Sequence, residues 1–137
     1  MPADLGLLPA PGMARRSPAA EARHLHPAAL PHWRALLGCL WQEHKDRVTG
    51  FCLACHDARQ AAADPGGGPD ARQAAWRRAS AMWHRAVAEW RALAEIEAAL
   101  SRLAAGRFGW CQQCGAAIAA SRLTQIPQIR YCPACDH

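Results

Sequence analysis

Two stretches of the chain lack proline and carry apolar residues at the three- and four-residue spacings typical of amphipathic helices. The first runs from Trp33 to about Ala63. Its apolar stripe consists of Trp33, Leu37, Leu40, Val48, Phe51 and Cys55. Gly38 and Gly50 interrupt the stretch, and each costs roughly 1 kcal/mol against alanine inside a helix. The pattern nevertheless predicts one long helix here.

The second stretch runs from Ala71 to about Ala105 and contains neither proline nor glycine. Two apolar series recur in it every seven residues, offset from one another by three positions. The large members are Trp76, Trp83 and Trp90, and the smaller ones are Ala79, Ala86, Leu93 and Leu100. Together they occupy the a and d positions of a heptad seam, which then shifts to Ile96 and Leu103. We therefore expect the indole rings to pack against the first helix.

The two stretches are separated by the strongest helix breaker in the chain, Asp64-Pro65-Gly66-Gly67-Gly68-Pro69-Asp70. Two prolines around three glycines cannot continue a helix, and Asp70 is placed to cap the helix that follows. Two long helices joined by so short a break predict an antiparallel helical hairpin. Its tip lies at about residues 64–70, and Gly106 suits the C-cap of the second helix.

Four cysteines near the C-terminus form two CxxC pairs, Cys111/Cys114 and Cys132/Cys135, separated by 17 residues. Two intervening residues let a tight turn aim both sulfurs of a pair at one point, and the gap lets the chain double back. Four thiolates fill a tetrahedral site and leave no position for a reacting water. The spacing therefore predicts one structural Zn²⁺ held by these four cysteines, in preference to disulfides.

The N-terminal 31 residues hold six of the ten prolines, which remove backbone donors and resist regular structure. We expect a flexible tail there. The predicted protein is mainly α, with this tail over residues 1–31 and an antiparallel coiled-coil helical hairpin over residues 32–105. A small C-terminal zinc finger with four cysteine ligands follows over residues 106–137.

Composition and charge add limits to this picture. The chain has 137 residues, and alanine supplies much of its 51% hydrophobic fraction, which favours a helical protein over one with a deep core. No apolar run approaches the ~18 residues of a membrane span. The short apolar stretch from Leu5 to Leu8 precedes the basic pair Arg15-Arg16, the reverse of a signal peptide. We expect a cytoplasmic protein without membrane contact, in which thiols stay reduced.

No catalytic motif emerges from the sequence. There is no phosphate-binding loop, nucleophile elbow or paired-carboxylate site, so we expect no enzyme. Cys52-Leu53-Ala54-Cys55-His56 matches the C-x-x-C-H pattern of haem attachment. Haem attachment needs export, which the N-terminus does not support. On a helix, the side chains of Cys52, Cys55 and His56 share one face, as a second metal or redox site would require. Small apolar packing residues, a second metal or redox site, and haem are the alternatives for this motif, and Cys39 has no assigned role.

The end of the second helical stretch and the predicted zinc finger carry further residues of a known family pattern. They are the run Glu95-Ile96-Glu97-Ala98-Ala99-Leu100, Gly106, Phe108, Gly109, Gly115, Ile118, Arg122, Leu123 and Pro127. With the four cysteines, this pattern resembles the DksA/TraR family of C4 zinc-finger proteins over residues 95–135, and in architecture back to about Trp33. The resemblance implies a coiled-coil hairpin attached to a zinc-bound globular end.

The resemblance also implies a function. Members of the family bind bacterial RNA polymerase rather than promoter DNA and insert the hairpin into its secondary channel. The tip then lies near the active site and alters initiation, and principal members carry a DxxDxA pattern there. Here Asp64 and Asp70 stand six residues apart around three glycines, so the acidic character is retained but the motif is not. These aspartates are our candidate polymerase contacts in a monomeric protein; a turn residue and an N-cap are the alternative.

Principal members also help to bind guanosine tetraphosphate through basic residues at the globular end. Where that type has arginine and lysine, this chain has Ile126 before Pro127 and Asp136 after the last cysteine. A polyphosphate requires cationic donors. We therefore expect weak or absent dependence on this alarmone.

A module that binds nucleic acid directly is the alternative function. The net charge of +5 permits it. The candidate contacts are arginines of the second helix and the finger: Arg72, Arg77, Arg78, Arg85, Arg91, Arg102, Arg107, Arg122 and Arg130. Affinity for duplex DNA that falls steeply with salt would indicate this function, whereas co-elution with core polymerase would indicate the first.

Overall fold

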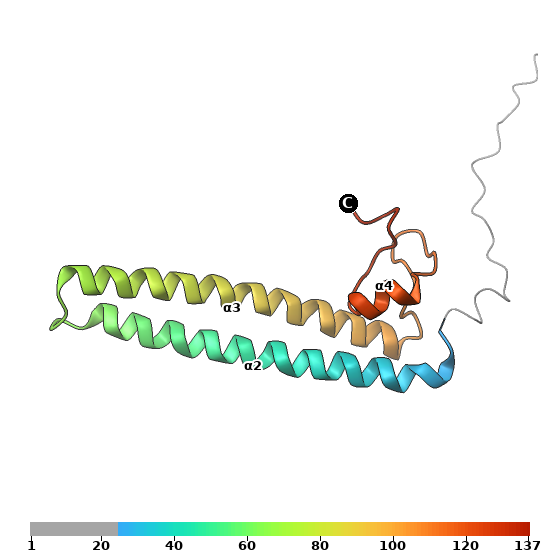
Figure 1. The fold of residues 1–137 in the computed structure, drawn as a ribbon, viewed down its shortest axis with the longest axis horizontal. Coiled ribbons are helices and arrows are strands. Elements are labelled where there is room, and N and C mark those ends of the chain that lie inside the picture. The colour runs from blue at the N-terminus through green and yellow to red at the C-terminus, as the bar shows by residue number, and fades with distance from the viewer. Residues whose placement is uncertain (1–24) are drawn as a thin grey trace, which may run out of the picture.

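The computed structural model describes residues 25–137, so most of the predicted tail lies outside the described residues. In this part of the chain a short 3₁₀ turn, η1 (Pro27–Ala29), leads into α2 (Leu30–Ala63), α3 (Pro69–Ala104) and α4 (Ala120–Gln125). Figure 1 shows α2 and α3 running side by side and antiparallel, with α4 beside the end opposite the tip. The predicted mainly α hairpin with a small C-terminal cysteine-bearing end is confirmed.

Each long helix has a proline in its first turn, and both helices start earlier than predicted. Pro31 lies in the first turn of α2, and α3 starts at Pro69 with Gly68 as its N-cap residue. A proline fits the first turn because the N–H that it lacks has no partner there in any helix. Asp70 consequently lies inside the first turn of α3, and its predicted role as the N-cap was wrong. Its carboxylate still faces the positive end of the helix dipole.

The inner seam of α3 is shifted by one position from the predicted one where the tryptophans were expected, so that Ala75 is buried in place of Trp76. The buried apolar side chains of α3 are the alanines at 75, 79 and 86 near the tip, followed by Leu93, Ile96, Ala99 and Leu103 toward the base. The tryptophans stand one position beyond this seam, and the structure leaves 55% of Trp76, 57% of Trp83 and 63% of Trp90 exposed. Our expectation that the indoles fill the helix interface was therefore wrong.

The hydrophobic core lies at one end of the hairpin, which we call the base (residues 30–46 of α2 and 87–104 of α3). Its buried members include Trp33, Leu37, Ile96 and Leu103, joined by apolar residues of the C-terminal segment. Toward the other end, the tip half (residues 47–63 and 69–86), the buried cluster contains only Cys55, Ala58 and Ala79. No helix within residues 25–137 combines the length and apolar character needed to cross a bilayer.

Candidate metal centre and hairpin tip

The four C-terminal cysteines converge on one point. Their sulfur atoms all lie within 4.8 Å of one another, and the sulfurs of Cys114 and Cys132 are 3.6 Å apart. Around a tetrahedral zinc with Zn–S bonds of about 2.3 Å, neighbouring sulfurs lie about 3.8 Å apart. Cys111 and Cys132 are buried, while Cys114 is exposed. The donor set and its spacing therefore fit one four-coordinate zinc ion with no open position.

Backbone hydrogen bonds shape the two knuckles that present the sulfurs. In the first, the Gly115 N–H donates to the Cys111 carbonyl at 2.8 Å, and the Cys111 N–H donates to the Ala116 carbonyl at 2.7 Å. Gly115 has a φ of 67°, in the left-handed region that glycine adopts without steric cost. In the second knuckle, the N–H groups of Cys135 and Asp136 both donate to the Cys132 carbonyl at 3.0 Å.

The thiols of this cluster differ in acidity. Burial opposes ionisation of Cys111, but backbone N–H groups of Cys114, Cys132 and Gln113 outweigh it and lower the pKa of Cys111 to about 6. Burial and hydrogen bonds with the other three thiols raise the pKa of Cys135 to about 12. Four sulfurs this close repel one another as thiolates, so full ionisation needs a cation among them.

The finger packs onto the base of the hairpin through its apolar residues. Ile118 and Leu123 have no exposed surface, and both belong to the core cluster that contains Cys111 and Cys132. The Trp33 ring of α2 meets Phe108 at a centroid distance of 5.5 Å. The short helix α4 ends at Gln125, two residues before Pro127. The cysteine site and the hairpin therefore form one packed unit.

Two arginines that the sequence analysis treated as nucleic-acid contacts instead hold the finger to α3. Arg102 is only 4% exposed, and its Nη2 donates to the carbonyls of Gln128 at 3.1 Å and Ile129 at 3.3 Å. Burial, followed by repulsion from Arg130, lowers the pKa of Arg102. Arg130 forms a bidentate ion pair with Glu95: its Nε donates to Oε2 at 2.5 Å and its Nη2 donates to Oε1 at 3.0 Å. No local spacing in the sequence marks either contact, because each joins residues more than 25 positions apart.

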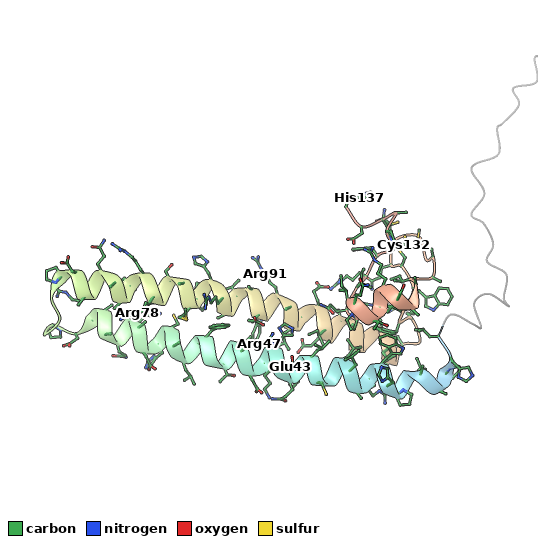
Figure 2. All side chains as sticks on the ribbon, viewed as in Figure 1. Glu43, Arg47, Arg78, Arg91, Cys132 and His137 are labelled. Carbon is green, nitrogen blue, oxygen red and sulfur yellow. The ribbon has the colours of Figure 1, made fainter. Side chains whose placement is uncertain are left out.

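A third arginine of that set is also engaged within the finger. Arg122 of α4 forms an ion pair with Asp136, next to the last cysteine ligand. Arg85 stacks over Phe51 of α2, with its guanidinium carbon 5.8 Å from the ring centroid. Figure 2 shows Cys132 at the globular end and Arg78 far from it, near the tip. The arginines proposed for nucleic-acid binding are thus dispersed along the molecule, and several of them already form contacts within the protein.

The tip presents both candidate aspartates to solvent. Asp64 ends α2, and its Oδ1 accepts a hydrogen bond from the Gly66 N–H at 3.0 Å. The Gly67 N–H donates to the Asp64 carbonyl at 3.2 Å, which closes the turn. Asp64 and Asp70 are both exposed, and neither forms an ion pair among the described residues. Asp64 thus has the turn role that loop chemistry implies, while one of its carboxylate oxygens remains open to a partner.

The C-x-x-C-H motif does not assemble a second metal centre in residues 25–137. The cluster at the C-terminal finger is the one group of three or more possible ligands that comes together there. Cys55 is buried in the small seam with Ala58 and Ala79, as the packing alternative proposed, whereas Cys52 and Cys39 are exposed. Cys52, Cys55 and His56 do line one cavity between the two helices.

Comparison with known proteins shows similarity to a family model, to a relative and to a solved structure. The family model "Prokaryotic dksA/traR C4-type zinc finger" matches residues 106–137. An uncharacterized protein of Aquifex aeolicus (strain VF5) is 44% identical over 43 residues, which span 31% of this chain and 30% of that protein. The solved structure of transcription factor DksA2 from Pseudomonas aeruginosa superposes with a TM-score of 0.71 and 27% identity. That superposition covers 88% of this chain and 86% of the Pseudomonas chain.

These similarities agree with the geometry of the cysteine site and with the hairpin. The family match begins at Gly106, where α3 has ended, and includes all four cysteines. The structural match extends over both long helices as well. The cysteines at 111, 114, 132 and 135 supply the ligands of one structural zinc. Residues 106–137 therefore form a C4-type zinc finger of the dksA/traR family, attached to a hairpin whose fold resembles that of the transcription factor DksA2.

Proposed function

We propose that this protein is a transcription regulator that binds bacterial RNA polymerase and places its hairpin in the secondary channel, with the tip toward the active site. The structural match to a transcription factor, extending over both helices of the hairpin, supports this function. The observation that carries it is the separation between the two ends of the molecule. A helix of 36 residues places the exposed aspartates of the tip ~50 Å from the zinc finger.

This separation divides the work between the two ends. The finger and the base form a packed unit that fixes the direction of the hairpin, while the tip of the two-helix hairpin carries two exposed carboxylates. Asp64 and Asp70 are the proposed polymerase contacts, and carboxylates at that position would act on cationic groups or on a metal ion of the partner. The role is binding without a catalytic step, by a cytoplasmic monomer.

Co-elution with core polymerase tests the proposal. The intact protein is expected to co-elute, and the double variant Asp64→Asn, Asp70→Asn is expected to co-elute less or to lose its effect on initiation in a transcription assay. Asp57→Asn is the matched control, because Asp57 is an exposed aspartate of α2 outside the tip at residues 64–70. Failure of the intact protein to bind polymerase would refute the proposal, and duplex DNA affinity that falls steeply with salt would favour direct binding to nucleic acid.

The proposal includes little or no dependence on guanosine tetraphosphate. Ile126 is 45% exposed at the globular end and offers no charge, and Asp136 is paired with Arg122. The pair neutralises a guanidinium that a phosphate group would otherwise use. Polymerase binding and transcription measured with and without the nucleotide are expected to agree; a marked difference would contradict this part of the proposal.

A further inference from the structure

Three exposed indole rings form a line along α3 that the zinc site and the tip do not explain. Trp76, Trp83 and Trp90 are each more than half exposed, although tryptophan is usually well buried in folded proteins. They flank the alanine seam at every second turn. A contiguous apolar strip of this kind on a soluble protein is typical of an interaction site.

The rings form one wall of a groove between the helices. A cavity of about 560 Å³ is lined by Trp76 and Trp83 of α3 and by Cys52 and Arg59 of α2. A second cavity of about 370 Å³ follows around Trp83 and Trp90. Its other lining residues are Val48, Cys52, Ala86, Val87 and Arg91. Because the two cavities share Cys52 and Trp83, they form one continuous trough, which we call the tryptophan groove.

The dimensions of the tryptophan groove fit an α-helix. From Trp76 to Trp90 the groove extends about 21 Å, or about four helical turns. The tryptophans recur every seven residues, and the α2 wall follows a comparable three- and four-residue spacing through Val48, Cys52 and Cys55. Two helices that both offer heptad-spaced residues beside their own seam are the walls into which the knobs of a third helix insert.

The charges along the groove indicate the kind of helix. Among the described residues that line its cavities, the formally charged ones are Arg59 and Arg91, and no carboxylate is among them. On the opposite side of the hairpin, by contrast, the lining includes Asp57 together with Arg78. Figure 2 places Arg91 on α3 near the middle of the hairpin. Apolar walls with cationic edges complement a helix that has apolar and acidic residues.

We propose that the tryptophan groove binds an amphipathic helix with acidic flanks, supplied by a partner protein. A second copy of this chain would bring an equally cationic groove against the first. A single-stranded nucleic acid would stack on the rings, but two arginines over about 21 Å neutralise little of its phosphate charge. The test of this proposal contains no polymerase, so its outcome does not depend on the proposed function.

Alkylation of the cysteines provides a test with an internal control. The probe is a synthetic peptide of about three heptads with leucine at positions a and d and glutamate at e and g. Cys52 and Cys39 are both exposed on α2, but only Cys52 lines the groove. The peptide is expected to slow the reaction of Cys52 with N-ethylmaleimide, followed by mass spectrometry, and to leave the reaction of Cys39 unchanged.

Binding of the labelled peptide, measured by fluorescence anisotropy, tests the residues themselves. Trp83→Ala is expected to weaken binding by roughly tenfold or more, whereas Leu53→Ala is expected to leave it unchanged. Leu53 is the matched control because it is 60% exposed on α2 and does not line the groove. The double variant Arg59→Glu, Arg91→Glu is expected to prefer a peptide with lysine in place of glutamate.

Four results would overturn the proposal. The first is equal affinity for the acidic peptide and for a scrambled peptide of the same composition. The second is an unchanged affinity in Trp83→Ala, with circular dichroism showing that the variant is folded. The third is dimerisation of the intact protein that Trp83→Ala abolishes, which would assign the groove to a second copy. The fourth is protection of Cys52 by oligothymidylate but not by the peptide, which would assign it to single-stranded nucleic acid.

Discussion

At the base of the hairpin, α2 and α3 meet through Trp33, Leu37, Ile96 and Leu103, whereas in the tip half they meet mainly through alanine. The base also receives the finger, with Ile118 and Leu123 fully buried. Burial of a large apolar side chain contributes about 1.5–3 kcal/mol, and an alanine methyl contributes far less. Stability is therefore concentrated at the base, while the tip half offers its larger side chains to solvent.

Removal of zinc should have the largest effect on this contrast. A chelator, or Cys132→Ser, is expected to unfold residues 106–137, since structural zinc supplies about 10–16 kcal/mol of apparent binding free energy in zinc-finger peptides. Hydrogen exchange should then accelerate in the finger and at the base of the hairpin. Cys39→Ser is the control, because Cys39 is exposed and lies outside the cluster. Unchanged exchange in the finger after complete removal of zinc would contradict the assigned role.

Truncation of Leu37 should show how much more a buried side chain of the base contributes to stability than an exposed side chain of the hairpin. This side chain is 0% exposed, and Leu37→Ala is expected to lower the free energy of unfolding by about 2–5 kcal/mol. Leu53→Ala, at a position 60% exposed, is expected to change it by no more than about 0.5 kcal/mol. Thermal and urea unfolding of both variants measures the difference. Similar losses of stability in the two variants would contradict the assignment of Leu37 to the hydrophobic core.

The link between the finger and α3 can be weakened without touching zinc. Arg102→Met removes the donor to the Gln128 and Ile129 carbonyls and is expected to cost about 1–3 kcal/mol. Exchange of amides in the segment around Pro127 should increase, while the cysteines keep their zinc. Arg72→Met, at an exposed site near the tip, is the matched control. Equal stability of the two variants would be evidence against a structural role for Arg102.

Replacement of helical glycines should have the smallest effect, in the stabilising direction. Gly38 and Gly50 lie inside α2, and a Cβ atom at either position would meet nothing within 4 Å. Alanine loses less backbone entropy on folding, so each substitution is expected to raise the free energy of unfolding by about 0.5–1 kcal/mol. A loss of stability in Gly50→Ala would mean that this part of α2 needs the flexibility of glycine.

Features that depend on neighbouring residues were accessible from the sequence. The two CxxC pairs, the glycine after Cys114 and the break at Asp64–Asp70 each specify a local geometry that does not depend on the rest of the fold. The start of α3 was placed two residues late, because Pro69 was counted as part of the break although proline is favoured in the first turn of a helix. Its misplacement also produced the wrong N-cap assignment for Asp70.

The exposure of the tryptophans was not accessible in the same way. Ala79 and Ala86 stand seven residues apart. A heptad pattern can be completed with the residues three positions earlier, Trp76 and Trp83, or with those four positions earlier, Ala75 and Met82. The predicted seam contains Trp76 and Trp83, whereas the fold buries Ala75 and partly buries Met82. Only the packing of two helices decides between these choices, since large rings inside the seam would hold the helix axes apart. The contacts of Arg102 likewise depend on carbonyls 26 and 27 residues away.

The alanine seam also determines the thickness of the hairpin. Small side chains let helix axes approach to the short end of the usual range of about 8–10 Å, so alanine at these positions favours a thin tip half. Any opening that the tip enters sets an upper limit on that width. Leucine in place of Ala79 or Ala86 would widen the hairpin without altering the charge at its tip. The width of the hairpin and the charge of its tip can therefore be varied separately.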